Sequence, residues 1–502
     1  MSARAAGVLL HPTSLPGRFG IGDLGPAAIA FLDFLRQAEQ TVWQILPLGP
    51  TGAYDSPYNC LSAFAGNPLL ISPEVLVADG FLPATSLQGA PRFVDGVVDY
   101  QDVRAHREAL LLEAWQLFQS AATPAQRQAL QEFRESPDQR LWLDDWALFA
   151  ALAARERTAD WSAWDLDVVH RNEAALQAAR GRLEDAIAFQ TFVQHLFFSQ
   201  WKRLREAAAG RGIQIMGDIP IYVAYGSADV WAHQRLFHLD EDGRPTVVAG
   251  VPPDYFSETG QLWGNPLYRW DVLAEDGYGW WVERMRASFR LFDLVRVDHF
   301  RAFASYWEVP ADHRTALNGV WRKGPGAAFF EALRGELGEL PIVAEDLGLI
   351  DEEVRELLAA TGFPGMKVLQ FGFYEEDGAH LPHNHGTHAV VYTGTHDNDT
   401  ARGWWARLKE EERVRVHDYL GGDGSVIERD LARAAYTSPA ERAIVPAQDL
   451  LGLGSEAAMN QPGRAAGNWR WRLTDGQLRP ILAKRLARLA RLTGRAPQRS
   501  LE

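Results

Sequence analysis

Short apolar runs that end in polar residues recur along the chain. They are separated by stretches in which apolar residues repeat every three or four positions, the spacing of an amphipathic helix. Eight runs stand out, at residues 7–12, 41–48, 213–220, 294–300, 342–346, 366–371, 389–396 and 443–448. Runs of this length and apolar character are typical of strands that are buried on both faces of a parallel sheet. We therefore expect eight buried strands.

Helices are predicted between these strands. The clearest helical patterns cover residues 26–38, 192–208 and 280–291, and a basic amphipathic helix at residues 481–492 follows the last strand. Strands that alternate with helices indicate an α/β fold with a parallel sheet, and eight such units predict a (β/α)8 barrel of the TIM type. We expect residues 1–502 to form this single domain, without a separate β domain after the eighth strand.

Two of the connections are too long for a simple barrel. About 165 residues separate the second strand from the third, and about 70 separate the third from the fourth, whereas a minimal connection needs far fewer. We therefore expect insertions at about residues 50–191 and 224–279. The first contains helical patterns such as residues 141–150, so the insertions should be mainly helical. Residues 374–386 show no helical pattern, which departs from an ideal barrel.

Composition and charge narrow the range of partners. Lys and Arg total 50 and Asp and Glu total 65, so the formal net charge is −15. This balance disfavours nucleic acid and anionic membranes, both of which select a basic face. The chain has no run of about 18 apolar residues that would span a membrane, and it begins without the apolar stretch of a signal peptide. Its single cysteine, Cys60, suits a reducing compartment, so we expect a cytoplasmic monomer.

Acidic residues stand at the carboxyl ends of four predicted strands. Asp218, Asp298, Glu345 and Asp397 each lie in or directly after an otherwise apolar run, where an ionised carboxylate is costly without partners. One such residue could belong to a buried ion pair. Four on different strands point into the same end of a barrel, the end that carries active sites in this fold, and together they favour catalysis.

Paired carboxyl groups are the machinery for cleaving a glycosidic bond. One protonates the leaving oxygen, and the other meets the oxocarbenium-like carbon. In a retaining enzyme the two lie about 5 Å apart, a separation that adjacent strands, about 4.8 Å apart, can supply. The fourth and fifth strands are therefore suitable hosts for such a pair.

Several segments resemble one known family. The segments are Asp218-Ile-Pro-Ile-Tyr-Val223, Arg296-Val-Asp-His-Phe-Arg301, Ala344-Glu-Asp-Leu-Gly348 and Thr393-Gly-Thr-His-Asp-Asn-Asp-Thr400. They resemble the four signature regions of the α-amylase superfamily and, in detail, those of the amylomaltases, or 4-α-glucanotransferases. Residues 55–58, the loop at residues 250–268, and residues 460–463 and 467–472 are similar to the same family. The resemblance extends from Leu10 to Arg472.

The resemblance implies a role for each carboxylate. Asp298 corresponds to the nucleophile, Glu345 to the general acid/base and Asp397 to the group that stabilises the transition state. Arg296 lies two residues before Asp298 and so points to the same side of the strand, where its charge would keep that carboxylate ionised. Glu345 must start protonated, so we expect its pKa to be raised. His396 would assist Asp397, and Asp218 resembles the third-strand aspartate that organises the site.

Residues that would bind a glucan are also indicated. Sugar rings stack on flat side chains, and amide or carboxylate groups read their hydroxyls. The candidates are Tyr54 and Tyr58 after the second strand, Asp254, Gln261, Trp263 and Asn265 in the Gly- and Pro-bounded loop, and Asn460 and Asn468 near the eighth strand. For each of these alone, a role in a turn or in packing is about as well supported as contact with a ligand.

Three functions remain open on this basis. The first is a 4-α-glucanotransferase that moves α-1,4-glucan segments between maltooligosaccharide or starch-type chains through a covalent glycosyl-enzyme. The second is an α-1,4-glucan hydrolase with the same carboxylates, and the third is an inactive carbohydrate-binding barrel. A metal site at His383, His385, His388 and His396 is disfavoured because their spacing matches no standard ligand pattern. We expect neither a metal nor a cofactor.

Overall fold

Eight parallel strands form the central sheet of the protein. The computed structural model describes residues 4–253, 257–374, 378–464 and 466–497. The strands are β1 (Ala5–Leu9), β2 (Val42–Gln44), β3 (Gln214–Ile219), β6 (Leu294–Val297), β9 (Ile342–Ala344), β10 (Gly365–Val368), β11 (Ala389–Tyr392) and β12 (Arg442–Pro446). They are hydrogen-bonded in the order β10-β11-β12-β1-β2-β3-β6-β9. Each strand lies within or overlaps one of the eight predicted runs, so the predicted set is confirmed.

The sheet closes on itself. β9 and β10 are its two ends, and the backbone N–H of Ala344 in β9 donates to the carbonyl of Pro364, directly before β10, over 2.9 Å. Around this ring, alternate side chains face opposite ways. Leu9, Val42, Met216 and Leu294 belong to a buried cluster to which all eight strands contribute, so this cluster fills the lumen. The predicted (β/α)8 barrel is confirmed.

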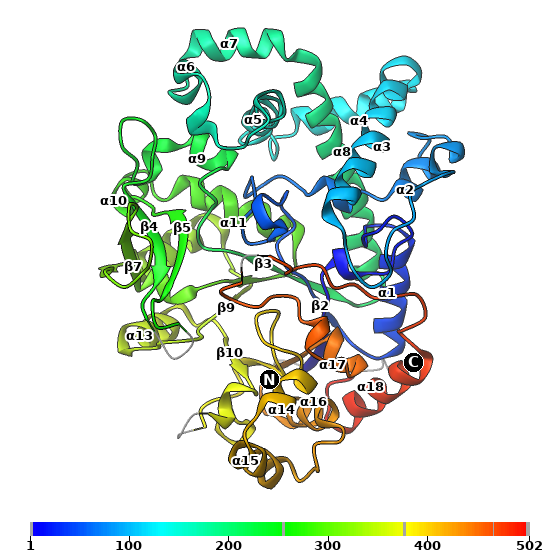
Figure 1. Cartoon of the computed structure of the whole chain (residues 1–502), viewed down its shortest axis with the longest axis vertical. Helices are drawn as coiled ribbons and strands as arrows, with labels where there is room; N and C mark the ends of the chain where they lie inside the picture. Colours follow the sequence, from blue (N-terminus) through cyan, green and yellow to red (C-terminus); the bar gives the residue numbers. More distant parts are fainter. Residues whose placement is uncertain (1–3, 254–256, 375–377, 465, 498–502) are drawn as a thin grey trace.

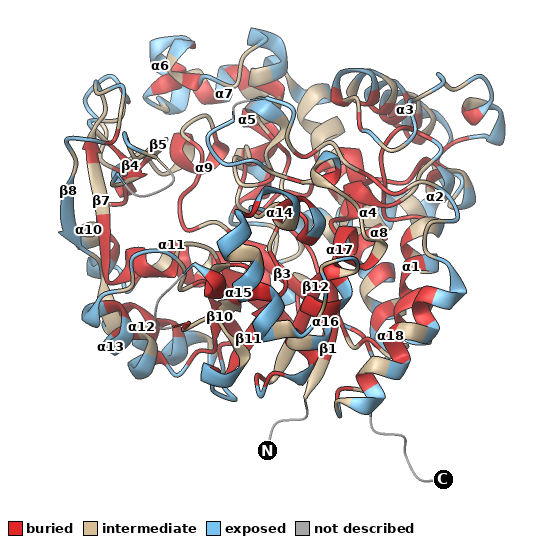
Figure 2. Cartoon of the chain, turned by 60° about the horizontal axis from the view of Figure 1, so that its bottom comes forward, coloured by how far each residue is buried: buried red, intermediate tan, exposed pale blue. Residues whose placement is uncertain are grey.

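Helices cover the outside of the barrel. They are α1 (Pro26–Gln37), α8 (Glu184–Ala209), α11 (Gly279–Leu291), α12 (Gly326–Leu337), α13 (Glu352–Thr361), α14 (Ala401–Arg407), α15 (Glu410–Leu420), α16 (Ile427–Thr437), α17 (Ala447–Leu451) and α18 (Pro480–Leu492). The four helices predicted most clearly are all present. Figure 2 shows the buried residues gathered on the strands and on the inward faces of these helices, whereas α15 is mostly exposed.

All the regular secondary structure between β2 and β3 is helical. Before α8 it contains α2 (Pro73–Ala78), α3 (Tyr100–Ala121), α4 (Pro124–Glu135), α5 (Leu143–Glu156), α6 (Leu166–Val169) and α7 (Glu173–Arg182), which gather at one end of the molecule (Figure 1). This agrees with a barrel that carries helical insertions. The insertion boundaries at about residues 50–191 and 224–279 stay predictions.

A small second sheet flanks the barrel. Its strands are β4 (Val247–Val251), β5 (Gln261–Pro266), β7 (Ser305–Pro310) and β8 (Val320–Lys323), antiparallel in the order β5-β4-β7-β8, and α9 (Ala228–Ala232) and α10 (Trp270–Glu275) adjoin it. The prediction that residues 250–268 form a loop is wrong, because β5 and the end of β4 lie there. Gly250 sits beside a register shift in β4 and Gly264 has a φ of 78°. Glycine at such irregular strand positions breaks the alternation by which a strand is recognised.

The remaining segments fit the expectations. Of residues 374–386, those described contain a short 3-10 turn, Pro382–Asn384, and no α-helix. After β12, the described residues form helices α17 and α18 and no further strand. No helix in the described ranges is long and apolar enough to cross a membrane.

Two glycines test how closely β3 packs against Phe292, the residue that follows α11. A Cβ at Gly217 in β3 would lie 2.2 Å from the ring of the buried Phe292, so Gly217→Ala should lower the free energy of unfolding by about 1–3 kcal/mol through overpacking. Gly181 in the inserted helix α7 has no atom within 4 Å of the same position, so Gly181→Ala should raise the free energy of unfolding by up to about 1 kcal/mol. Thermal or urea unfolding of both variants measures the contrast. Equal effects would mean that β3 packs against Phe292 more loosely than described.

Candidate active site

The predicted carboxylates meet at the carboxyl ends of the strands. Asp218 lies in β3, Asp298 follows β6, Glu345 follows β9, and Asp397 lies in the loop after β11. These four carboxylates and the residues around them contact one another and form one site. The strand alternation that sends Met216 and Leu294 into the lumen also directs the side chains two and four residues later to that side.

A buried arginine joins two of these carboxylates. Arg296 Nη1 lies 2.8 Å from Asp218 Oδ2 and 2.9 Å from Asp298 Oδ1. The Tyr58 hydroxyl donates to Asp218 Oδ2 over 2.7 Å, so a residue from the segment after β2 completes the cluster. The Asp218 side chain is fully buried, and both of its oxygens are hydrogen-bonded: Arg296 donates to Oδ1 and Oδ2, and Tyr58 donates to Oδ2. The buried charge is thereby compensated.

Asp298 and Glu345 are neighbours across two strands. In the β6–β9 pair Val297 lies opposite Ala344, and the ladder continues as the Glu345 N–H donates to the Val297 carbonyl over 3.1 Å. The next residues, Asp298 and Glu345, therefore lie side by side just after the ends of these neighbouring strands, and neighbouring strands are about 4.8 Å apart. The backbone N–H of His299 donates to Glu345 Oε2 over 2.6 Å, which fixes the second carboxyl beside the first.

The surroundings give these two carboxyls different affinities for a proton. Burial and the nearby charge of Asp298 raise the pKa of Glu345 to about 8. Burial also raises the pKa of Asp298, but Arg296 opposes it, and the result is about 6. Near neutral pH a shared proton therefore resides on Glu345 and leaves Asp298 ionised.

Asp397 is held ionised by a different set of contacts. His396 Nε2 lies 3.1 Å from Asp397 Oδ2, and the Asn460 amide donates to Oδ1 over 2.6 Å. Partial burial acts to raise the pKa of Asp397, but the interaction with His396 and both hydrogen bonds outweigh it and lower the pKa to about 2. The His396 ring stacks on Tyr58 with centroids 4.9 Å apart, which ties this carboxylate to the arginine cluster.

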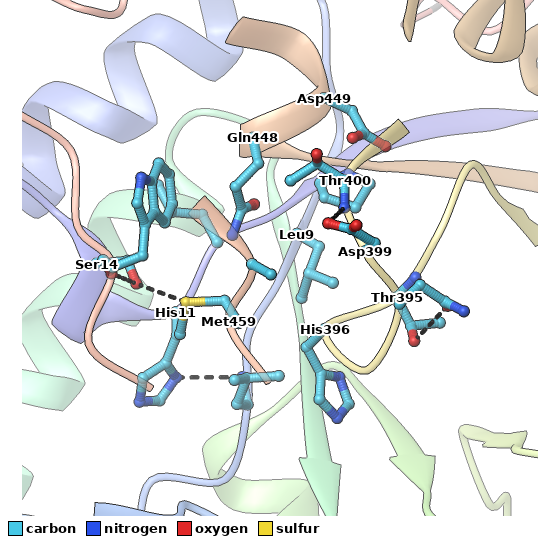
Figure 3. Close-up of a pocket in the computed structure, with 16 residues that line it drawn as sticks. Leu9, His11, Ser14, Thr395, His396, Asp399, Thr400, Gln448, Asp449 and Met459 are labelled. Atoms are coloured by element: carbon cyan, nitrogen blue, oxygen red, sulfur yellow. Dashed lines mark hydrogen bonds between the residues drawn. The ribbon is translucent and has the colours of Figure 1, made fainter. Parts of the chain in front are cut away.

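Two histidines in the site were not singled out from the sequence. His11 follows β1, and its Nδ1 accepts the Leu46 N–H over 3.2 Å (Figure 3), while burial lowers the pKa of His11 to about 3. His299 follows Asp298 with a left-handed φ of 53°, and burial lowers its pKa to about 3 as well. Both are therefore neutral. Each histidine lies two residues after the end of a barrel strand, and this position could have marked both as site residues in the sequence.

Trp263 lies at the edge of the site. It is 37% exposed on β5, and its ring meets the ring of His299 edge-on with centroids 4.8 Å apart. Its Nε1 donates to the Gln261 side chain over 3.3 Å. Asn265 instead donates to the carbonyl of Val223 over 2.9 Å, so this residue braces the segment that follows β3.

Two other residues predicted to bind a glucan make no contact that the structure describes with the four carboxylates of the site. Tyr54 is 69% exposed in a 3-10 turn (Ala53–Asp55) and has a φ of 63°. Asn468 accepts from the Gln461 N–H and donates to the Arg464 carbonyl, so it holds its own loop together. Asp254 lies outside the described residues.

The remaining histidines of the possible metal cluster have separate partners. His383 contacts the Tyr419 hydroxyl, His385 the Ser438 hydroxyl and His388 the Gly362 carbonyl. Among the described residues, no group of three or more His, Cys, Asp or Glu side chains could hold a metal ion.

Comparison with known proteins assigns the family. A family model described as 4-alpha-glucanotransferase matches residues 10–478. The chain is 49% identical to the 4-alpha-glucanotransferase of Thermus thermophilus, over 98% of this chain and 99% of the relative, and 49% identical to that of Synechocystis sp., over 99% of each. Its structure matches that of an amylomaltase from Streptococcus agalactiae in complex with acarbose, with a TM-score of 0.95, 38% identity and coverage of 98% of this chain and 100% of that one. The chain therefore belongs to the 4-α-glucanotransferase family.

Proposed function

We propose that this 4-α-glucanotransferase cuts an α-1,4-glucan and passes the released segment to another glucan chain by a retaining double displacement. The observation that carries the proposal is the position of Asp298 and Glu345 at the ends of two paired strands, in surroundings that raise the pKa of Glu345 above that of Asp298. A separation of about 5 Å between two carboxyls is the geometry for a covalent glycosyl-enzyme.

In the first displacement, Glu345 donates its proton to the glycosidic oxygen while a carboxylate oxygen of Asp298 attacks the anomeric carbon. The C–O bond to the leaving chain breaks, and the glucan segment becomes an ester of Asp298. In the second, the now ionised Glu345 takes the proton of an acceptor 4-hydroxyl. The acceptor oxygen attacks the same carbon and releases Asp298, so the two inversions leave the α configuration unchanged.

The surrounding residues support the charge that develops on the sugar. Asp397 is ionised by its contacts with His396 and Asn460 and is available to accept hydrogen bonds from hydroxyls of the distorted ring. Arg296 keeps Asp298 ionised before attack, and Asp218 with Tyr58 holds the guanidinium in place.

The acceptor must compete with water at about 55 M, so transfer requires a bound and oriented acceptor. Trp263 and Gln261 form an exposed edge beside His299, which suits them to stack on and hydrogen-bond a sugar ring. Glucan contacts of Tyr54, Tyr58, Asp254, Asn460, Asn265 and Asn468 stay predictions from the sequence, and the amides of Asn265 and Asn468 donate to backbone carbonyls. A hydrolase would use the same carboxylates without holding an acceptor.

The proposed substrates of the enzyme are maltooligosaccharides and starch- or glycogen-type chains. The amylomaltase of Streptococcus agalactiae was solved in complex with acarbose, which supports an α-glucan site in this chain as well. We further propose that the enzyme acts in the cytoplasm, because its lone Cys60 suits a reducing compartment. That it is a monomer stays a prediction.

The roles of the two carboxylates are separable with an activated donor. A maltosyl fluoride needs little protonation to leave, so Glu345→Ala should still accumulate a glycosyl-enzyme, whereas Asp298→Ala should form none. Digestion and mass spectrometry of the trapped protein should find the sugar on Asp298. Asp298→Asn and Glu345→Gln should each lower turnover by several orders of magnitude with little change in melting temperature, because they sit at the active-site end. A sugar on any other residue would refute the assignment.

The pH dependence of kcat/KM should be bell-shaped. Below about pH 6 Asp298 takes up a proton and can no longer attack, and above about pH 8 Glu345 loses the proton that it must donate. Both limbs belong to the coupled pair. With Glu345→Gln and a fluoride donor, the alkaline limb should disappear and the acid limb should remain. An alkaline limb that survives this substitution would assign the general acid elsewhere.

The products from maltotriose distinguish transfer from hydrolysis. We expect glucose together with longer maltooligosaccharides, and almost no net gain in reducing ends. Trp263→Ala should weaken transfer more than hydrolysis, because the acceptor loses a stacking surface. Chromatography alongside a reducing-end assay over time provides the measurement. Reducing ends that rise as fast as maltotriose disappears would replace the transferase proposal with the hydrolase.

A further inference from the structure

One buried carboxylate holds both ends of the loop that carries Asp397. This loop, residues 393–400, connects β11 to α14. At its start the Thr393 hydroxyl donates to Asp449 Oδ2 over 2.6 Å, and just beyond its end the Ala401 backbone N–H donates to Asp449 Oδ1 over 2.7 Å. Asp449 lies on α17, directly after β12, and is only 2% exposed.

The middle of the loop is tied to itself. Asn398 Oδ1 accepts from both the N–H and the hydroxyl of Thr395, over 2.8 and 2.9 Å, and the Asp397 N–H donates to the Thr395 hydroxyl over 3.2 Å. The loop is therefore internally braced. A shift at its ends would carry Asp397 with it instead of being absorbed between them.

The loop has further anchors besides Asp449. The Asn460 backbone N–H donates to the His396 carbonyl over 3.1 Å, and the Gln370 amide donates to the Asp399 carbonyl over 2.9 Å. A pocket lined by His396, Asn398, Asp399, Thr400 and Asp449 among others lies along the loop (Figure 3). Asp449 differs from these two anchors because it contacts both ends of the loop.

The clamp needs the chemistry of a carboxylate. Two separate donors approach two different oxygens, and an ionised carboxylate accepts at both. An amide has only one acceptor atom and would hold the Thr393 hydroxyl only by donating to it, which reverses that hydrogen bond. The arrangement is costly, because burial, with the nearby charges of Glu428 and Asp399, raises the pKa of Asp449 to about 6 against the effect of the two hydrogen bonds.

We propose that Asp449 is a positioning residue for the transfer reaction, which sets the place of Asp397 relative to the sugar through the two ends of the loop. The proposal rests on the role of Asp397 in the proposed function. Misplacing a group at the reacting centre by about 1 Å costs roughly 100-fold in rate. The effect should therefore fall on kcat, since ground-state binding draws on many other contacts.

Thr393 offers the sharpest test because its side chain can be changed without altering the shape of the core. Thr393→Val removes the hydroxyl and keeps the volume, and Thr393→Ser keeps the hydroxyl. We expect Thr393→Val to lower kcat for maltotriose disproportionation by about 10-fold or more with KM within about 3-fold, and Thr393→Ser to restore most of the rate. Affinity for acarbose should fall with kcat/KM in Thr393→Val if the transition-state geometry is what changes.

Asp449→Asn should change kcat in the same direction, and the double variant with Thr393→Val should be no slower than about the worse single variant, because both substitutions alter the contact between Thr393 and Asp449. Asp229→Asn is the matched control. Asp229 is also buried, accepts a backbone N–H (from Ala63) over 2.7 Å and has a pKa raised by burial to about 6, but it does not contact this loop. Its kcat should stay within about 2-fold of the parent.

The outcomes separate the clamp from the catalytic assignment. Folded Thr393→Val with unchanged kcat would overturn the clamp, and this result stands even if Asp449→Asn fails to fold. An equal loss of kcat in Asp229→Asn would also overturn it, since any buried carboxylate would then serve. Asp397→Asn should lower kcat by at least about 100-fold. If it does not, the catalytic role of Asp397 fails, and the clamp falls with it for that separate reason.

Discussion

The ion pairs of the buried Arg296 guanidinium with Asp218 and Asp298 are the interaction on which the candidate active site depends. The guanidinium lies between Asp218 and Asp298, beside the apolar cluster in the lumen. Removing a charge from water costs several kcal/mol, and without Arg296 the two carboxylates would lie in this buried setting with no opposing charge between them. The surroundings must therefore hold all three groups together. Tyr58 reaches in from outside the barrel to supply the last donor, and its ring then fixes His396.

Three carboxyl groups of similar chemistry acquire different protonation states from this arrangement. Glu345 faces an ionised neighbour in a buried setting, and its pKa rises the furthest of the three. Asp298 shares that setting but touches Arg296, so its pKa rises less. Asp397 has a histidine and an amide donor, and its pKa falls. A protonated carboxyl and two ionised carboxylates thus coexist near neutral pH, the states that the proposed acid, nucleophile and stabilising anion require.

The features that could be predicted from the sequence are those with a local cause. Each barrel strand is buried on both faces and so appears as an apolar run, and a carboxylate at its end stands out against that run. The small antiparallel sheet could not be predicted in this way, because Gly250 and Gly264 interrupt its alternation. The hydrogen bonds of Asp449 with the two ends of the loop, and the hydrogen bond from Tyr58, could not be predicted from the sequence either. They depend on contacts between residues 56 and 160 positions apart, which local patterns do not encode.

The same separations have a consequence for how the enzyme matures. Tyr58 lies 160 positions from Asp218 and 338 from His396, so these contacts close very large loops in the unfolded chain. The entropy of closing them is lost before the contacts return any stability, which places such pairings late in folding. The pairing of β1 with β12, with Ala5 opposite Arg442, also joins the two ends of the chain. Closing the barrel and assembling the contacts of Tyr58 therefore require the same approach of segments that are far apart in the sequence.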